Sequence, residues 1–272
     1  MSGQTPGGET RDAALARLYD LDLAEDPGDL ELYLALARRT GGPIVELAVG
    51  TGRVAVPLAA AGHVVIGVDA DPAMLERARA RVRADPTGGE IAARVHLVRH
   101  DMVEVRRQDL GAPLGDGARL AILALNSILL LADRPRQRAV LATMAGLLAP
   151  GGLVAVDAWL PQVDDLARFD GRLSLEWLRT DAATGREVLK QAAAWYDESG
   201  RIVTLTTMFD EAEPGGSPRR WTRSDALRLI TADELREFAE DAGLVVERLA
   251  GDHDLGELGP GSERAVLIAR RP

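Results

Sequence analysis

The segment Ile44-Val-Glu-Leu-Ala-Val-Gly-Thr-Gly52 joins a short apolar run to a turn that contains two glycines. Glycine has no Cβ, so Gly50 and Gly52 let the backbone take unusual dihedral angles and let a ligand lie directly against the chain. A helix is expected to follow from Arg53, and the free N–H groups of its first turn would face the same place. The segment therefore predicts a strand, a tight turn and a helix that together bind a polar ligand.

The sequence on both sides of this turn continues the alternation of strands and helices. Further apolar runs that we expect to form strands lie at residues 64–68, 95–99, 120–125, 153–159, 244–249 and 265–269. Such alternation is typical of a parallel sheet with helices on both faces. Right-handed crossovers then place the strand-to-helix loops along one edge, where open α/β sheets bind ligands. We predict an α/β fold with a doubly wound, Rossmann-like sheet of seven strands.

The pattern changes after Pro161, where extended segments follow one another directly. Turn signals between them lie at Thr184-Gly185, Ser199-Gly200 and Pro214-Gly215-Gly216. Turns at this spacing are typical of antiparallel strands, so we predict a small antiparallel β insert that serves as a substrate lobe. The predicted bounds are 1–10 for a disordered N-terminus, 11–160 and 229–272 for a Rossmann-like domain with N-terminal lid helices, and 161–228 for the insert.

The composition favours a protein that acts on a small molecule. The 272 residues have a formal net charge of -10, so the surface repels phosphate backbones and we expect no nucleic-acid partner. The absence of cysteine excludes disulfides and thiolate metal sites, and we expect no metal. No apolar run is long enough to span a bilayer and no signal segment is evident, so we predict no membrane partner and a cytoplasmic location.

An acidic residue ends the second predicted strand, beside the glycine turn. Asp69 stands where a carboxylate can accept hydrogen bonds from the two hydroxyls of a ribose, so a nucleoside-containing cofactor explains the turn and the acid together. The run Gly50-Thr-Gly-Arg-Val-Ala55 also fits a loose dinucleotide fingerprint. Glu46 argues against that choice, because its charge would repel a pyrophosphate and attract an ammonium group.

Five segments resemble the motifs of class I S-adenosylmethionine-dependent methyltransferases. They are Glu46-Leu-Ala-Val-Gly-Thr-Gly-Arg53, Val68-Asp-Ala-Asp-Pro-Ala-Met-Leu75, His100-Asp-Met102, Asn126-Ser127 and Leu148-Ala-Pro-Gly-Gly-Leu-Val154. The likeness covers residues 41–159 and the closing segment 231–270. It implies S-adenosyl-L-methionine as cofactor and S-adenosyl-L-homocysteine as product. The insert and the Gly251-Asp-His-Asp254 turn are similar to the small-molecule branch of secondary metabolism, which includes N-methyltransferases of amino sugars.

The resemblance assigns cofactor-binding roles to residues around the turn. It implies that Gly50 and Gly52 pack under the methionine part of the cofactor, while Glu46 supports its ammonium group. Asp69 would bind the ribose hydroxyls. The family more often has glycine in place of Ala48, whose methyl group narrows the space under the cofactor.

The resemblance also assigns residues to the adenine end and to the fourth strand. Asp101 would accept a hydrogen bond from the adenine amino group, and the Met102 backbone N–H would bind the ring, with Ala70 and Met74 along its face. Asn126 falls at the end of the fourth predicted strand, where a backbone carbonyl meets the ammonium group.

Methyl transfer from a sulfonium needs alignment and, for a hydroxyl or ammonium acceptor, removal of one proton. His253 is a candidate general base, because the loop after the sixth strand lies at the cofactor edge of such a sheet and imidazole suits proton transfer near neutrality. Asp252 or Asp254 could orient it. The alternative interpretation of His253 and Asp254 is a solvated loop without catalytic function.

Other side chains are candidates for contacts with cofactor or acceptor. Tyr19 and Tyr33, on the predicted lid helices, could touch the methionine end, and Arg53 could pair with the cofactor carboxylate. The candidates for the wall of the acceptor pocket are Trp159, Trp195 and Trp221. Packing within the protein is the alternative for each of them.

The sequence thus predicts methyl transfer to a nitrogen or oxygen atom of a small metabolite. The expected partner is a small-molecule acceptor, and a homodimer is allowed for. An NAD(P)-dependent oxidoreductase is a second reading, disfavoured by Glu46 and by the motif at Asp101. A non-catalytic module that binds S-adenosylmethionine is a third.

Overall fold

The computed structural model describes residues 9–25, 27–213 and 215–272. Its chain divides into two compact units, one with residues up to 25 and 163–227, the other with residues 26–162 and 228–272. The disorder predicted for residues 1–10 falls on residues that are mostly outside the described part. Thr10 is described, and its hydroxyl accepts a hydrogen bond from the N–H of Ala13 at the start of the first helix.

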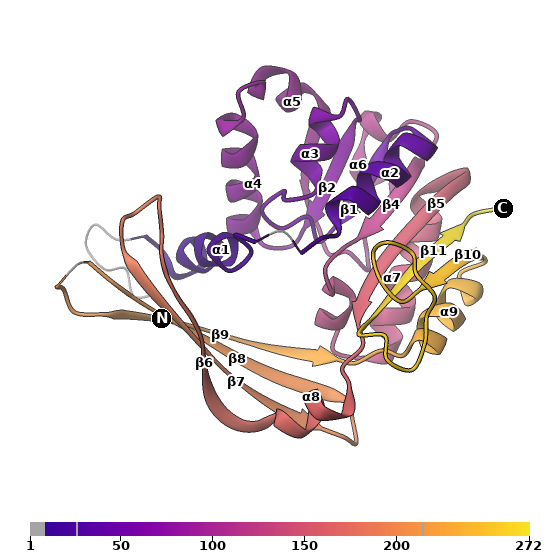
Figure 1. Ribbon diagram of the computed structural model, residues 1–272. Helices are drawn as coiled ribbons and strands as arrows, with labels where there is room; N and C mark the ends of the chain where they lie inside the picture. The colour runs from indigo at the N-terminus through magenta and orange to yellow at the C-terminus, as the bar shows by residue number, and fades with distance from the viewer. Residues whose placement is uncertain (1–8, 26, 214) are drawn as a thin grey trace. The chain divides into compact units, whose positions relative to one another are not determined.

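The larger unit is built on a seven-stranded sheet, which confirms the predicted fold class (Figure 1). The strands are β1 (Ile44–Leu47), β2 (Val65–Asp69), β3 (Val95–Arg99), β4 (Ala118–Leu123), β5 (Leu148–Trp159), β10 (Val245–Ala250) and β11 (Arg264–Arg270). Their order is β10-β11-β5-β4-β1-β2-β3. β11 pairs in the antiparallel sense with both of its neighbours, β10 and β5, and the other pairs are parallel. The chain order reverses between β1 and β4, which is where this class of sheet binds ligands.

Some helices of this unit begin at residues that local chemistry favours. The helices are α2 (Leu30–Thr40), α3 (Ala55–Ala60), α4 (Pro72–Ala84), α5 (Gly88–Arg94), α6 (Arg107–Leu110), α7 (Arg134–Leu147) and α9 (Ala232–Asp241). Asp71 caps α4 and Pro72 occupies its first turn, and Thr231 forms the predicted capping box of α9 with Glu234. No helix among the described residues is long and apolar enough to cross a membrane.

The core beneath the glycine turn fixes its position on the sheet. Leu47, Ile66 and Leu120 are fully buried, and burial of a side chain of this size contributes about 1.5–3 kcal/mol. A Cβ built on Gly67 of β2 would lie only 2.7 Å from the side chain of Val49. Glycine at residue 67 is therefore required for the turn after β1 to pack against β2.

The smaller unit contains a four-stranded antiparallel sheet, which confirms the predicted insert. Its strands, in the order in which they pair, are β6 (Asp170–Thr180), β7 (Glu187–Asp197), β8 (Ile202–Ala212) and β9 (Arg219–Arg228), preceded by α8 (Val163–Arg168).

Helix α1 (Arg11–Asp22) belongs to this smaller unit, whereas we had assigned it to the Rossmann-like domain as a lid. Leu18 of α1 packs in one apolar cluster with Val188, Phe209 and Trp221 of the strands. Helical periodicity in the sequence identifies a helix but not the elements against which it packs. For this reason the sequence alone places α1 with the segment that follows it in the chain.

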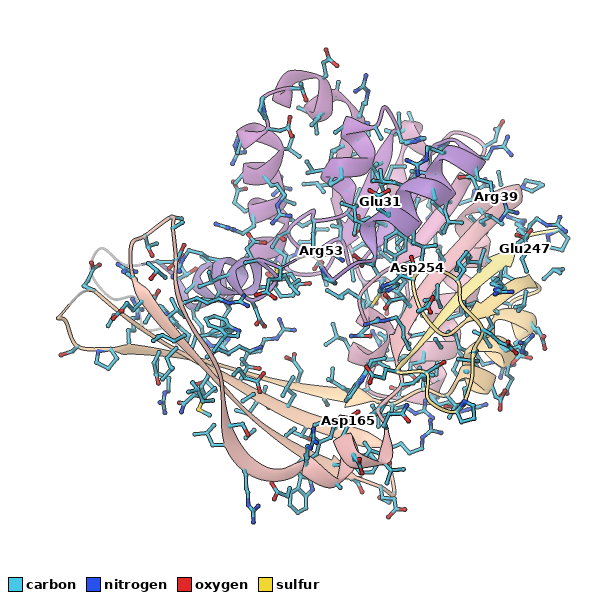
Figure 2. The ribbon with its side chains drawn as sticks, viewed as in Figure 1. Glu31, Arg39, Arg53, Asp165, Glu247 and Asp254 are labelled. Carbon is cyan, nitrogen blue, oxygen red and sulfur yellow. The ribbon has the colours of Figure 1, made fainter. Side chains whose placement is uncertain are left out.

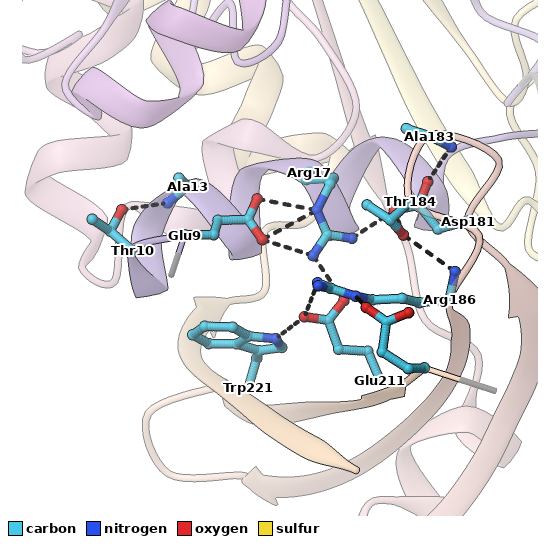
Figure 3. Close-up of polar contacts among 11 residues, drawn as sticks. Glu9, Thr10, Ala13, Arg17, Asp181, Ala183, Thr184, Arg186, Glu211 and Trp221 are labelled. Atoms are coloured by element: carbon cyan, nitrogen blue, oxygen red, sulfur yellow. Dashed lines mark hydrogen bonds and ion pairs between the residues drawn. The ribbon is translucent and has the colours of Figure 1, made fainter. Parts of the chain in front are cut away.

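A buried ion cluster also ties α1 to the sheet (Figure 3). Arg17 is 6% exposed, and its guanidinium pairs with Asp181 at 2.6 Å, Glu211 at 2.8 Å and Glu9 at 2.9 Å. Glu211 also accepts a hydrogen bond from the indole N–H of Trp221 at 2.7 Å. Every charge at the centre of this cluster therefore has a partner within the same unit.

Candidate active site

The turn after β1 takes left-handed backbone conformations at alternate residues. The φ angles are 53° at Ala48, 55° at Gly50 and 78° at Gly52. Glycine adopts such angles freely, whereas an alanine is strained there by about 1–2 kcal/mol. The positive φ at residue 48 explains why the family more often has glycine where this chain has Ala48. Helix α3 begins at Ala55, two residues later than we predicted.

The structure joins Asp69 directly to this turn. One carboxylate oxygen of Asp69 accepts a hydrogen bond from the Gly50 N–H at 2.8 Å, and the other accepts from the Asp71 N–H at 2.8 Å. Burial raises the pKa of Asp69 above its ordinary value, and the two N–H donors act in the opposite direction. Each oxygen retains a lone pair for a further donor, such as a ribose hydroxyl.

Three buried side-chain oxygens near the turn have no hydrogen-bond partner among the described residues. They are the Tyr33 hydroxyl, Glu46 Oε2 and Thr51 Oγ1, in residues that are at most 3% exposed. An unpaired buried polar group costs about 1–3 kcal/mol, and native structures leave few of them. The three come from α2, β1 and the turn after β1, so this corner of the larger unit is suited to a polar ligand.

Glu46 is the acidic member of this group. Burial raises its pKa to about 8, with a further contribution from the carboxylates of Asp29 and Asp69, while the guanidinium of Arg53 and the backbone N–H of Ala55 oppose the rise. Its carboxyl group is therefore largely protonated at neutral pH, and a bound ammonium group would favour the ionised form.

Arg53 has a partner that the sequence did not reveal. Its two terminal nitrogens each lie 2.6 Å from a different oxygen of Asp29, which precedes α2 and is fully buried. This bidentate pair fixes the guanidinium beside the turn. Burial, together with Asp157, Asp29 and Glu46, raises the pKa of Tyr33 well above its ordinary value, so its hydroxyl stays neutral.

These residues fit the cofactor that the sequence implied. Two carboxylates, Asp29 and Asp69, and one guanidinium, Arg53, act on Glu46, so the electrostatic environment favours an ammonium or sulfonium group and opposes a pyrophosphate. The unpaired oxygens provide acceptors, and the left-handed turn exposes backbone to a ligand.

Asp101 follows β3 next to the end of β2, as predicted. Its carboxylate accepts from the Val103 N–H at 2.8 Å and from Arg136 of α7 at 2.8 Å. Burial alone would raise the pKa of Asp101, but these two donors lower it below its ordinary value. Met74 is buried and Ala70 is exposed, with Met102 between these extremes.

The ends of β4 and β5 meet in a second polar cluster. Leu125 and Asn126 both have left-handed backbone angles, with φ of 48° and 64°. The backbone N–H of Asn126 donates to Asp157 at 3.1 Å. The side-chain oxygen of Asn126 accepts from the backbone N–H of Trp159 at 2.6 Å. Trp159 is thereby fixed at the end of β5.

The histidine that we predicted as a base has a different partner from the one expected. His253 Nε2 lies 2.6 Å from Asp157, which is fully buried in β5, and Arg264 of β11 contacts the other oxygen of Asp157 at 2.9 Å. Asp254 is exposed on the loop between β10 and β11 (Figure 2). The carboxylate that contacts His253 is therefore Asp157 and not Asp254.

The aromatic candidates fall in different environments. Trp221 is 5% exposed in the core of the smaller unit, with its N–H donated to Glu211, so it packs within the protein and does not line a pocket. Trp195 of β7 is 59% exposed. Tyr19 lies on α1, and its role stays a prediction.

Four features place this protein in the Rossmann-like class of enzymes that use a nucleoside-containing cofactor. They are the doubly wound sheet, its glycine turn, Asp69 at the end of β2 and the buried Glu46 under the turn. Residues 44–152 match the family model described as a methyltransferase domain. The chain therefore contains an S-adenosylmethionine-dependent methyltransferase domain. The match includes the turn, Asp69, Asp101 and Asn126 but not Asp157, His253 or Arg264.

Solved structures of methyltransferases have the same fold. CcbJ from Streptomyces caelestis gives a TM-score of 0.71 at 25% identity over 91% of each chain. The sugar N-methyltransferase KedS8 from Streptoalloteichus sp ATCC 53650 gives 0.69 at 21% identity, over 100% of this chain and 96% of that one. CalS10, an amino pentose methyltransferase from Micromonospora echinaspora, gives 0.64 at 20% identity, over 99% and 100%. No curated protein sequence matches the chain.

Proposed function

We propose that the methyl acceptor is a nitrogen or oxygen atom of a small metabolite, and in particular an amino sugar. The acceptors named for KedS8 and CalS10 support this class. The formal charge of -10 suits a cationic amino acceptor better than a nucleic acid. A cytoplasmic location and a homodimer belong to the same proposal.

The observation that supports the cofactor site best is the group of unpaired buried oxygens around the glycine turn. In the proposed arrangement, Gly50 and Gly52 lie under the methionine part, with the small Ala48 beside them. Glu46 and the Asn126 carbonyl accept from the ammonium group, and Tyr33 contributes its hydroxyl. Arg53, already oriented by Asp29, binds the carboxylate.

The nucleoside part is proposed to occupy the ends of β2 and β3. Asp69 binds the ribose hydroxyls, and Asp101 accepts from the adenine amino group, beside the Met102 N–H. Ala70 and Met74 line the adenine face. Tyr19 is a proposed contact to the cofactor from α1.

S-adenosylmethionine supplies an electrophilic methyl group, so the protein has to align the acceptor and remove its proton. His253 is the proposed base: with Nε2 directed at Asp157, Nδ1 is the nitrogen that takes the proton. Trp159 and Trp195 are proposed to contact the acceptor.

Calorimetry with S-adenosylmethionine and NADH tests the cofactor site, and release of S-adenosylhomocysteine from a panel of amino sugars and their hydroxyl analogues tests the acceptor. We expect binding of S-adenosylmethionine alone and turnover with amino sugars. NADH binding without a response to S-adenosylmethionine would overturn the cofactor site. Turnover confined to the hydroxyl analogues would overturn the amino-sugar acceptor, and binding without turnover of any acceptor would indicate a non-catalytic module.

A further inference from the structure

Asp157 occupies a position that an apolar side chain would ordinarily fill. It lies in β5 between Val156 and Ala158, both fully buried, and is itself 0% exposed. A buried carboxylate is unfavourable unless it is paired and hydrogen-bonded, so this residue has to be explained by what it contacts.

Three donors from three different segments converge on the Asp157 carboxylate. Oδ1 accepts from the Asn126 N–H after β4 at 3.1 Å and from Arg264 at the start of β11 at 2.9 Å. Oδ2 lies 2.6 Å from Nε2 of His253 in the β10–β11 loop. Arg264 offsets the buried negative charge.

The contact with His253 selects one form of its ring. A carboxylate has only acceptors, so at 2.6 Å Nε2 must carry the hydrogen and the neutral ring has its lone pair on Nδ1. The His253 side chain keeps 11% of its area exposed, and with Arg264 it lines a surface cavity. Asp157 thus orients the ring through Nε2, and the His253 side chain is not fully buried.

The contact with Asn126 fixes a second part of the active site. Leu125 and Asn126 are consecutive residues with left-handed backbone angles, a conformation that persists only where its surroundings impose it. Asp157 binds the N–H of this turn, and the Asn126 side-chain oxygen accepts from Trp159 two residues beyond Asp157.

We propose that Asp157 is the positioning residue of the active site: one of its oxygens sets the tautomer and orientation of His253, and the other fixes the left-handed turn at Asn126. This inference rests on the proposed function for the role of His253 as base, but the tautomer and the turn do not depend on it. An amide cannot replace the carboxylate, because it offers one acceptor oxygen to three donors.

The direct test is ¹⁵N NMR of the histidine rings in the full chain, at a pH where the imidazole is neutral, with His253 assigned by H253Q. We expect Nε2–H in the natural protein and a mixture of tautomers in Asp157→Asn. A ring with Nδ1–H in the natural protein, or an unchanged spectrum in Asp157→Asn, would overturn the proposal even if methyl transfer is confirmed.

The kinetic test compares three variants. Asp157→Asn should lower kcat by about 100-fold and weaken S-adenosylmethionine binding by about tenfold, whereas Asp157→Glu should recover part of both. Ser262→Ala is the loop control, because its hydroxyl accepts only from Gly259 in the same loop among the bonds described. If Ser262→Ala reproduces the loss, or if Asp157→Asn leaves kcat unchanged in an enzyme that turns over, Asp157 does not position the site.

Discussion

The Arg17 cluster of the smaller unit and the Glu46 corner of the larger unit are both buried and polar, yet they differ in completeness. Arg17 pairs with three carboxylates at 2.6–2.9 Å. Glu46, Tyr33 and Thr51 each keep an oxygen without a partner among the described residues. A buried cluster in which every hydrogen-bonding group has a partner stabilises the fold. A buried cluster with unpaired groups can use them to bind a ligand.

The pKa values follow the same difference. Burial would lower the pKa of Arg17, but hydrogen bonds and attraction from Glu211 and Glu9 raise it above its ordinary value. For Glu46 burial is the largest effect, and it raises the pKa to about 8. The surroundings of Arg17 therefore favour its charged guanidinium, whereas those of Glu46 favour a neutral carboxyl group until a cation binds.

The largest expected effect is on stability, from Arg17→Met. Loss of the guanidinium leaves buried Asp181 without its cation and Glu211 with only Arg186, at 3.6 Å, which should destabilise the smaller unit by about 3–5 kcal/mol. Urea unfolding measures this through tryptophan fluorescence. Arg220→Met is the control, because the Arg220 side chain is 53% exposed and its partner Asp210 is only partly buried, so a change below about 1 kcal/mol is expected. Equal losses in the two variants would contradict a structural role for the Arg17 cluster.

The next effect is on binding, from Glu46→Gln. The amide is nearly isosteric but cannot provide a negative charge for the ammonium group, so the Kd for S-adenosylmethionine should rise about 100-fold, or close to 3 kcal/mol. The unliganded protein should keep its stability. Calorimetry measures the Kd, and an unchanged value would remove Glu46 from the cofactor site.

Proton release on binding provides a third test. With a folded pKa of about 8 against an ordinary 4.5, the Glu46 contribution to stability is complete below pH 4.5 and lost as the pH rises through 8, at about 1.4 kcal/mol per pH unit between them. A ligand ammonium that ionises Glu46 at pH 7 should release close to one proton. Calorimetry in buffers of different ionisation enthalpy measures this number; Glu46→Gln should release none, and equal release from both proteins would contradict the assignment.

The smallest effect is expected from Thr51→Val, which removes an unpaired buried hydroxyl without changing the shape of the side chain. The unliganded protein should gain about 1 kcal/mol, while cofactor binding weakens a few-fold. Denaturant titration with and without S-adenosylmethionine separates the two. A loss of stability in the unliganded protein would mean that the hydroxyl has a partner after all.

Much of the fold could be predicted because it depends on local pattern. Alternation of strands and helices, the glycine turn and Asp69 at the end of β2 are all encoded within short segments. The packing of α1 was not predictable in this way. Its placement depends on Arg17 meeting Asp181 and Glu211, which lie more than 160 residues away in the sequence.

The site was predictable to the same extent. The residues within the motifs lie at the glycine turn and at the ends of the predicted strands, and their roles stay predictions. Asp29 and Asp157 were missed. The one signal for Asp157 is an acid inside the apolar run Leu153-Val-Ala-Val-Asp-Ala-Trp159. Its partner His253 lies 96 residues away, so sequence proximity suggested Asp254 instead.

We infer that the unpaired oxygens of the larger unit mark the cofactor site. A crystal structure with S-adenosylhomocysteine tests it most directly. We expect Glu46 Oε2, the Tyr33 hydroxyl and Thr51 Oγ1 each to gain a hydrogen bond from the ligand or from a water bound to it, while the Arg17 cluster stays unchanged. A ligand bound elsewhere, or three oxygens still unpaired beside it, would show that these oxygens do not mark the cofactor site.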